Sequence, residues 1–215
     1  MSRLRFGITM SADGYVAGPR QSLQNPLGEG GEKLHEWVVG LRTFLAIHGK
    51  EGGATGPDDE VVAESVQNIG ATIMGRQMFG GGDGPWGSDP PWRGWWGDDP
   101  PFHHPVFVLT HHEREPLPMK GGTTFYFVTD GIRAALDMAR KAAKGRDVNL
   151  AGGADAAQQY LRAGLIDEME IHVVPLMLGD GARLFENTEG RQAEYECVRV
   201  LGSPSVSHFK YRRKP

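Results

Sequence analysis

The chain has 215 residues, of which 39% are hydrophobic and 23% are charged, and its formal net charge is −4. This composition is typical of a globular domain that can bury a core, and the slight acidity argues against a general nucleic-acid binder. The single cysteine, Cys197, excludes an internal disulfide, and we find neither a signal peptide nor a membrane-spanning segment. We therefore expect one cytoplasmic domain over residues 1–215, with no membrane partner.

The N-terminal quarter predicts one strand followed by a long irregular region. Residues 3–10 alternate loosely and indicate a strand, and residues 12–14 (ADG) indicate a turn. Apolar residues at helical spacing predict a helix over 34–45, which Gly40 weakens. The surrounding segment, 19–56, is interpreted as an insertion whose role the sequence does not reveal.

A helix, a buried strand and a second short helix are expected next. Pro57 occupies a favoured first-turn position of a helix that Gly70 ends, and residues 71–74 indicate a strand. Gly75 then turns the chain into a short helix over 76–79. Backbone N–H groups at such a turn favour an anion, and the Arg76 fork could hold the same anion. An ordinary turn with a surface arginine is the alternative.

Residues 80–104 form a loop rich in glycine, proline and tryptophan. Residues 82–87 match the dinucleotide fingerprint GxGxxG, but they neither follow a strand nor open a helix, so we reject that interpretation. The four tryptophans could wall a flat ligand, pack against a second subunit, or pin the loop down. Two histidine pairs, 103–104 and 111–112, are adjacent residues whose side chains usually point apart, so we expect no metal site.

The C-terminal half predicts alternating strands and helices, which implies parallel pairing with right-handed crossovers. The expected strands are 105–110, 124–128, 147–151 and 169–174, the expected helices are 131–144 and 154–163, and a hairpin joins 193–201 to 205–213. Asp130 is a predicted helix N-cap. Residues 151–154 (AGGA) end a strand and open a helix, where two glycines would let a pyrophosphate approach the backbone amides. A plain tight turn is the alternative there.

Four stretches in this order resemble the dihydrofolate reductase superfamily, and more closely the branch related to the reductase domain of bifunctional riboflavin-biosynthesis proteins. They are residues 7–14 (GITMSADG), 73–76 (IMGR), 106–110 (VFVLT), and 151–153 (AGG) followed by 166–169 (IDEM). The resemblance implies an α/β fold of three layers: a central mixed, mostly parallel sheet with helices on both faces and a C-terminal antiparallel hairpin. The deaminase partner of those bifunctional proteins carries a zinc signature that a single cysteine rules out here.

The resemblance also implies NADPH as cofactor. The residues implied to bind it are Thr9, Ser11 and Asp13 at the nicotinamide, Arg76, Thr110 and His111 at the 2′-phosphate with Gly75 and Gln77 beside them, and Gly152, Gly153, Ala154 and Asp155 at the pyrophosphate. Asp13 could equally be a turn-forming residue. The implied substrate contacts are Met10, Phe79 and Trp86. Charged hydrogen bonds to the 2′-phosphate are worth about 1.5–3 kcal/mol each, so NADPH should bind about ten- to a few hundred-fold more tightly than NADH.

Reduction of a C=N bond also needs a proton. Dihydrofolate reductase uses a carboxylate on the helix before the Gly-Arg turn, and counting back from Gly75 without a gap places Asp59 there. A carboxyl group buried against a ring would have a raised pKa and could relay a proton. Acids at 58–60 are equally what a helix N-terminus favours.

The sequence therefore predicts an NADPH-dependent reductase of a small heteroaromatic substrate, resembling 5-amino-6-(5-phosphoribosylamino)uracil reductase of riboflavin synthesis. A dihydrofolate or pterin reductase, and a non-catalytic nucleotide-binding protein on the same fold, remain alternatives, and a metal-dependent hydrolase built on the histidine pairs is a further rival. A homodimer is an expectation from the family.

Overall fold

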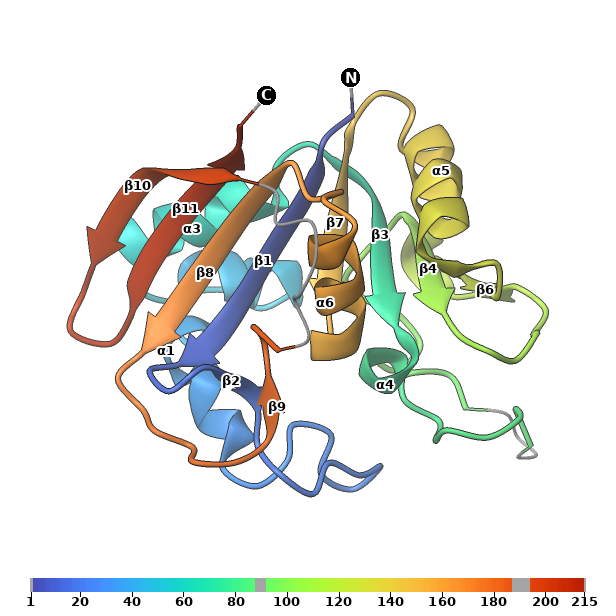
Figure 1. Cartoon of the computed structure of the whole chain (residues 1–215), viewed down its shortest axis with the longest axis horizontal. Coiled ribbons are helices and arrows are strands. Elements are labelled where there is room, and N and C mark those ends of the chain that lie inside the picture. Colours follow the sequence, from blue (N-terminus) through green and yellow to red (C-terminus); the bar gives the residue numbers. More distant parts are fainter. Residues whose placement is uncertain (1, 88–91, 187–193, 215) are drawn as a thin grey trace.

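A nine-stranded mixed sheet runs through the described part of the molecule, from β10 at one edge to β5 at the other. Figure 1 labels its strands from β10 to β6. The computed structural model describes residues 2–87, 92–186 and 194–214. Its strands are β1 (Leu4–Ser11), β2 (Tyr15–Ala17), β3 (Ile69–Gly75), β4 (Pro105–Leu109), β5 (Leu117–Pro118), β6 (Thr124–Val128), β7 (Asp147–Gly152), β8 (Glu168–Val174), β9 (Ala182–Arg183), β10 (Tyr195–Gly202) and β11 (Ser207–Arg213). Its helices are η1 (Gly31–His35), α1 (Glu36–Val39), α2 (Arg42–Ile47), α3 (Pro57–Val66), α4 (Arg76–Phe79), η2 (Lys120–Gly122), α5 (Gly131–Ala143) and α6 (Ala154–Arg162).

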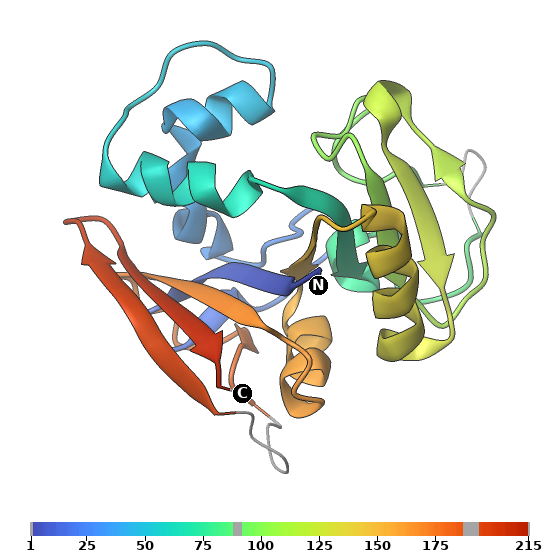
Figure 2. The ribbon, with the colours of Figure 1, turned by 90° about the horizontal axis from the view of Figure 1, so that it is seen from above.

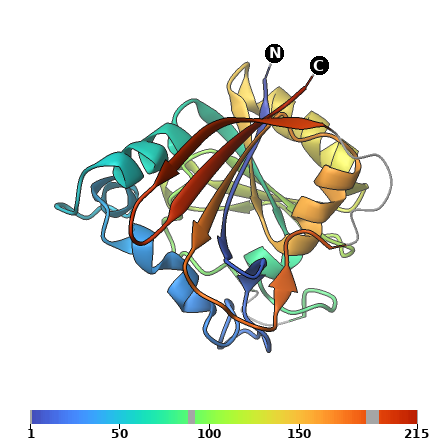
Figure 3. The ribbon, with the colours of Figure 1, turned by 60° about the vertical axis from the view of Figure 1, so that its left-hand side comes forward.

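The strand order is β10-β11-β8-β1-β7-β3-β4-β6-β5. The six central strands, from β8 to β6, are parallel to one another. The hairpin of β10 and β11 continues the sheet beyond β8 in antiparallel pairing (Figure 3), and β5 is antiparallel to β6. A separate pair, β2 with β9, forms a small second sheet. The predicted mixed, mostly parallel sheet with its C-terminal hairpin is thus confirmed; residue 193 of that hairpin lies outside the described residues.

Helices cover both faces of the sheet, so the predicted three layers are confirmed (Figure 2). On one face α5 and α6 pack against a core that includes Phe6, Ile73 and Leu150, all at most 2% exposed. Alternation along the strands explains this, because every second side chain of a strand points to the same face. Tyr160 is completely buried in this core, and its hydroxyl donates to the Ile132 carbonyl at 2.7 Å, which ties α6 to α5.

The opposite face is covered in two parts. The helices α1 and α3 lie over the β1–β8 side, and the tryptophan-rich loop packs over β4 and β6. Trp86, Trp92 and Trp96 join Phe79 and Phe125 in a second aromatic core, and Trp92 Nε1 donates to the Phe79 carbonyl at 2.8 Å. Within the described part of the loop, which omits 88–91, the tryptophans therefore pin the loop to the sheet.

Two local predictions are wrong. The expected helix 34–45 is broken after Gly40, where Leu41 is extended and pairs with Ala54 across a short bridge. Gly70 lies inside β3 rather than capping α3. A Cβ at this position would meet the Ala143 carbonyl oxygen at 2.7 Å, so the close approach of Ala143 is what requires a glycine. Asp130 is the N-cap residue of α5, as predicted, although its side chain makes no capping hydrogen bond.

Within the described residues, no helix combines the length and the apolar character needed to cross a bilayer.

Candidate active site

A cavity of about 280 Å³, here called the smaller cavity, lies where β3, β4 and β7 end. The predicted cofactor-binding residues that line this cavity are Gly75, Arg76, Gln77, Thr110, His111, Gly153 and Asp155. Parallel strands present their carboxyl ends at one edge of a sheet, which is where open α/β sheets collect ligands. The chain positions follow from this rule, because each of these residues comes at or directly after the end of a strand or at the start of the next helix.

Arg76 is held in this cavity by neutral partners. Its Nη1 donates to Thr110 Oγ1 at 3.2 Å, and its Nη2 donates to the Gly81 and Gly84 carbonyls, each at 3.2 Å. The guanidinium carbon lies 3.1 Å from the centroid of the Trp86 ring, and Nε is buried without a hydrogen-bond partner in the part of the chain that the structure describes. No described carboxylate lies within ion-pairing distance of it, so its charge is not neutralised by an ion pair there.

A second arginine, Arg114, was missed by the sequence analysis. Its guanidinium lies 4.8 Å from the ring centroids of both Trp86 and Phe127, and its buried Nη1 has no partner among the described residues. Burial, and next the charge of Arg114, lower the pKa of Arg76, whereas Asp83 partly offsets them. Two like charges beside one aromatic platform favour an anion as the missing counter-charge. The run of four polar residues that follows β4, 111–114, was the sequence signal that could have identified Arg114.

Glycines bring β3 and β7 together at the same edge. A Cβ at Gly75 would lie 3.3 Å from the Ala156 Cβ and 3.7 Å from the Gly153 backbone nitrogen. At Gly153 nothing lies within 4 Å of a built Cβ, so the approach to the N-terminus of α6 is open. Gly152 is buried with φ +107°, a backbone conformation that favours glycine, and Ala154 is half-buried behind Gly153. The predicted strand–Gly-Gly–helix arrangement is therefore present, with open space in front of it.

A larger cavity of about 610 Å³ lies on the face that α1 and α3 cover. Its floor is formed by β1, β3, β7 and β8, and its walls by η1, α1, α3 and residues 101–104. Thr9, predicted at the nicotinamide, lines this cavity and accepts a hydrogen bond from Trp37 Nε1 at 3.2 Å. The segment 19–56, whose role the sequence left open, thus supplies His35, Trp37 and Val38 as walls.

Polar residues alternate along the floor of the larger cavity. On β8 the side chains of Glu168, Glu170 and His172 face the cavity, and the intervening Met169 and Ile171 are buried in the core. The register carries this pattern across the sheet, with Thr9 of β1 opposite His172 and His172 opposite His208 of β11. The sequence analysis missed this face, although the alternation over 168–172 was visible as a signal.

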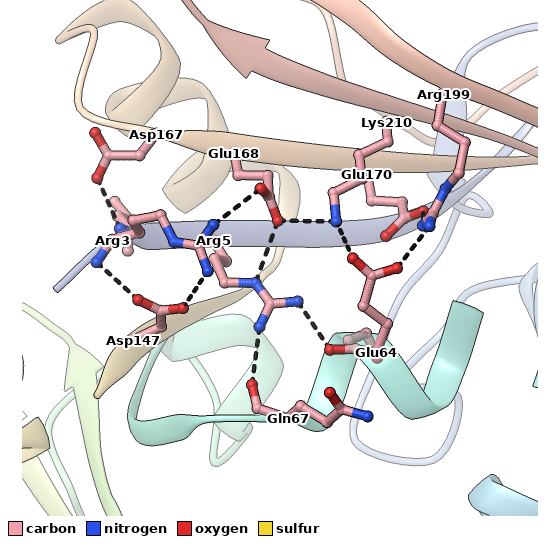
Figure 4. A network of polar contacts seen from close by, with 12 residues as sticks. Arg3, Arg5, Glu64, Gln67, Asp147, Asp167, Glu168, Glu170, Arg199 and Lys210 are labelled. Atoms are coloured by element: carbon pink, nitrogen blue, oxygen red, sulfur yellow. Dashed lines mark hydrogen bonds and ion pairs between the residues drawn. The ribbon is translucent and has the colours of Figure 1, made fainter. Parts of the chain in front are cut away.

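Most of these charges pair in one network (Figure 4). Glu168 contacts Arg3 at 3.3 Å, Arg5 at 3.5 Å and Lys210 at 3.1 Å. Glu64 of α3 pairs with Lys210 and, at 2.6 Å, with Arg199, which also contacts Glu170 at 2.7 Å. The figure shows that the network links β1, β8, β10 and β11 to α3. It therefore fixes the distance between α3 and the floor of the larger cavity.

Two histidines extend the polar face toward α3. His172 Nδ1 lies 2.7 Å from His208 Nδ1, and His208 Nε2 lies 3.1 Å from Asp58 Oδ1. The Trp37 ring contacts both imidazoles, at centroid distances of 5.0 and 5.1 Å. Burial, followed by the charges of His208 and Arg199, lowers the pKa of His172 to about 3. His172 is therefore neutral at ordinary pH.

The sequence predicts a raised pKa for Asp59, and the structure has the opposite. Asp59 is 2% exposed, its Oδ1 accepts the Thr43 N–H at 2.7 Å, and its Oδ2 lies 3.3 Å from Arg42 Nη2. The hydrogen bond from the Thr43 N–H holds the pKa of Asp59 below its usual range, and the positive charge of Arg42 adds a smaller effect in the same direction. The Asp59 carboxylate thus anchors the start of α2, and it is not among the residues that line the larger cavity.

Two other predicted nicotinamide residues make structural contacts. Ser11 Oγ donates to Asp13 Oδ1 at 2.6 Å, and Asp13 also accepts the Leu178 N–H at 3.1 Å and the Gly179 N–H at 2.7 Å. The Ser11 hydrogen bond, with those backbone donors, lowers the pKa of Asp13 to about 2. Asp13 thereby joins the turn after β1 to the loop after β8.

The predicted substrate contacts are not brought together. Phe79 is completely buried in the aromatic core, and Met10 packs against the core on the α5–α6 face. Trp86 supports Arg76 and donates from Nε1 to the His112 carbonyl at 2.9 Å. None of the three lines the larger cavity.

The histidines near the loop have separate partners. His103 Nδ1 lies 2.8 Å from the Gly121 carbonyl, and His104 Nε2 lies 2.8 Å from Thr72 Oγ1. Across residues 2–87, 92–186 and 194–214, no three or more histidine, cysteine, aspartate or glutamate side chains converge as metal ligands do.

Comparisons with known proteins agree with this architecture. The family model of the RibD C-terminal domain matches residues 3–206. The uncharacterized protein YwjB of Bacillus subtilis (strain 168) is 37% identical over 84 residues, which are 39% of this chain and 48% of that protein, so the chain spans about half the length of this curated relative.

Solved structures show the same fold. A putative riboflavin biosynthesis protein from Shewanella sp. PV-4 has a TM-score of 0.64 at 23% identity, with all of both chains covered. Acinetobacter baumannii RibD has a TM-score of 0.58 at 18% identity and covers 100% of this chain and 58% of its own. Dihydrofolate reductase from Enterococcus faecalis, complexed with NADP(H) and RAB-propyl, has a TM-score of 0.56 at 13% identity, with 99% and 97% covered. The chain belongs to the RibD C-terminal domain family.

Proposed function

We propose that this protein is an NADPH-dependent reductase of a small heteroaromatic substrate, of the riboflavin-pathway type. The observation that carries the proposal is the smaller cavity, which Arg76 lines without an ion-paired carboxylate among the described residues. Arg114, beside the same Trp86 ring, adds a second positive charge near this cavity. A dinucleotide with an additional 2′-phosphate is an anion that such a cavity suits. The names of the fold neighbours, which include RibD and an NADP(H)-bound dihydrofolate reductase, agree with it.

Each part of the cofactor has a matching part of the cavities. Arg76, Thr110 and His111 would hold the 2′-phosphate, and the open edge at Gly153 and the N-terminus of α6 would hold the pyrophosphate. Thr9 in the larger cavity would meet the nicotinamide, which supplies a hydride when bound. The substrate would therefore occupy the larger cavity.

The larger cavity suits a flat polar ring. Its volume of about 610 Å³ is that of a typical small-molecule site. Trp37 and Phe102 offer ring faces, and Asn149 offers a hydrogen-bonding amide on the floor. A pyrimidine or a pterin presents this combination of an aromatic face and polar edges.

Cofactor binding tests the proposal directly. We would titrate the purified protein with NADPH and NADH and follow tryptophan fluorescence. We expect NADPH to bind at least ten-fold more tightly, and Arg76→Ala to weaken NADPH binding by about ten-fold or more because a charged hydrogen bond is lost. Arg212→Ala is the matched control, since Arg212 is exposed on β11 at the other side of the sheet. Equal affinity for the two nucleotides, or an unaffected Arg76→Ala variant, would contradict the proposal.

Turnover separates the remaining alternatives. NADPH consumption would be measured with 5-amino-6-(5-phosphoribosylamino)uracil and with dihydrofolate. Consumption with the uracil supports the riboflavin-type reaction, and consumption with dihydrofolate alone supports a pterin reductase. Tight NADPH binding without consumption in either assay would favour a non-catalytic nucleotide-binding protein.

A further inference from the structure

Three ionisable side chains from three elements form a continuous hydrogen-bonded chain. Asp58 lies in the first turn of α3, and its Oδ1 contacts His208 Nε2 of β11 at 3.1 Å. His208 Nδ1 in turn contacts His172 Nδ1 of β8 at 2.7 Å. His208 is completely buried, so this side chain exchanges protons through its two neighbours. Ser203 Oγ donates to Asp58 Oδ2 at 2.9 Å, which fixes the orientation of the carboxylate.

The chain ends in the larger cavity. His172 lines the cavity, and its Nε2 has no hydrogen-bond partner among the described residues. Gly7 of β1 lies beside this nitrogen, and a Cβ built there would lie 4.0 Å from Nε2. Thr9 is the direct partner of His172 on β1, and Trp37 contacts both residues. The free nitrogen therefore lies beside the residue at which we place the reacting ring of the cofactor.

We propose that Asp58, His208 and His172 form a proton relay that delivers a proton from His172 Nε2 to a substrate bound in the larger cavity. The proposal rests on the proposed reductase function and supplies the proton source that Asp59 does not provide. His172 is the catalytic residue, because it touches the substrate. His208 and Asp58 are positioning residues that act through it.

The proton balance is simple. Reduction of a C=N bond by the nicotinamide proposed above leaves an electron pair on the substrate nitrogen. His172 forms the new N–H bond by giving up its Nε2 proton, and its Nδ1 takes the Nδ1 proton of His208. His208, which starts as a cation beside the Asp58 carboxylate, ends neutral. Water that enters after product release returns a proton to His172 Nε2, and the Nδ1 proton moves back to His208.

The surrounding charges determine where the proton rests. Arg199 of β10 faces the pair and opposes a cation at His172, although Glu170 of β8 and Glu64 of α3 hold this arginine in ion pairs. From β1 the pair faces the uncharged residues Gly7 and Thr9. His208 alone contacts a carboxylate, Asp58, at hydrogen-bonding distance. A positive charge on His208 thus has a carboxylate partner, whereas one on His172 would be opposed by Arg199.

Nuclear magnetic resonance of ¹⁵N-histidine-labelled protein tests the relay without a substrate. When His208 Nδ1 carries a proton, His172 Nδ1 must accept it, so His172 is in the Nε2–H form. When His208 Nδ1 has no proton, His172 is in the Nδ1–H form. We expect this tautomer change of His172 to coincide with protonation of His208 in a pH titration of the wild-type protein. Asp58→Asn should move the coupled transition to lower pH, because the carboxylate that contacts His208 Nε2 is removed. The signals of the exposed His48 serve as an internal control, and Asp58→Asn should leave them unchanged.

Two results would overturn the relay. One is a His172 ring that keeps one tautomer while His208 titrates, and the other is a coupled transition that Asp58→Asn leaves in place. The first result needs no variant, so a folding defect in Asp58→Asn cannot obscure it. NADPH binding is measured separately: its failure would contradict the reductase function and leave the tautomer result standing. In a turnover assay, His172→Gln should lower kcat about 100-fold or more with NADPH affinity unchanged.

Discussion

The guanidinium carbon of Arg76 lies 3.1 Å from the centroid of the Trp86 ring, so the aromatic face holds the cation in place. A contact of this kind is worth about 0.5–2 kcal/mol. We expect Trp86→Leu to weaken NADPH binding by about three- to thirty-fold, because Arg76 loses its support while its charge remains. Fluorescence would change with the substitution itself, so isothermal titration calorimetry is the better measurement. Trp96→Leu is the control, since Trp96 packs on Phe102 and Phe125 away from Arg76; an equal loss in both variants would mean that the whole loop matters rather than this contact.

The charge network predicts a large effect at Glu168. Glu168 is buried and contacts Arg3, Arg5 and Lys210, so a neutral side chain would leave the nearly buried ammonium of Lys210 with Glu64 alone. We expect Glu168→Gln to lower the free energy of unfolding by about 2–4 kcal/mol, as removal of one member of a buried network does. Urea denaturation would measure it. The exposed Glu196 on β10 provides the control, Glu196→Gln, which should change stability by less than about 0.5 kcal/mol.

Asp59 predicts a structural effect without a catalytic one. In Asp59→Asn the amide oxygen can still accept the Thr43 N–H, and only the pair with the exposed Arg42 is lost. We expect a loss of stability below about 1 kcal/mol and an unchanged kcat. Asp59→Ala should cost about 1–2 kcal/mol, because the Thr43 N–H at the start of α2 then lacks its partner. A strong fall of kcat in Asp59→Asn, at unchanged stability, would restore the carboxylate as a proton donor.

Asp13 predicts a pH-dependent contribution to stability. Its hydrogen bonds lower the folded-state pKa to about 2 from an ordinary value of 3.8. A depressed carboxylate pKa contributes stability that is fully present above the ordinary value and is lost as the pH falls through the folded-state value. We expect Asp13→Asn to have a lower Tm than the wild type at pH 7, and this difference to close as the pH falls from about 4 to about 2. Differential scanning calorimetry across that range would show it, and a difference that does not depend on pH would contradict the assignment. The exposed Asp137 on α5 supplies the control, Asp137→Asn.

Much of the fold could be predicted because its signals are local. Alternating apolar runs and punctuating glycines place β6 on its observed residues, and they place β4, β7, β8, α5 and α6 within one residue of their observed ends. The break at Leu41 and the position of Gly70 inside β3 could not be predicted in this way. Each depends on a distant backbone group, the Ala54 pairing in one case and the close approach of Ala143 in the other.

The two cavities also differ in how far local sequence signals predict them. Arg76, Thr110 and Gly153 follow strand ends, so the parallel order alone predicts that they meet, and they do line the smaller cavity. The larger cavity combines His172 with Trp37, and the relay behind it adds Asp58 and His208. These residues lie far apart in the sequence, and only the strand order and register bring them together. The resemblance placed the proton source at Asp59, one residue away from the carboxylate that contacts His208.

The alternation along β8 divides one strand between two kinds of mutational constraint. Substitutions at Met169 and Ile171 act on the buried core, and substitutions at Glu168, Glu170 and His172 act on the cavity floor. A change at His172 can therefore alter the cavity while Met169 and Ile171 preserve the core, whereas Glu168 and Glu170 also hold the ion pairs of the floor. A library that varies only the cavity-facing residues of β1 and β8, in matched cross-strand rows, would explore new substrates with the core sequence held constant.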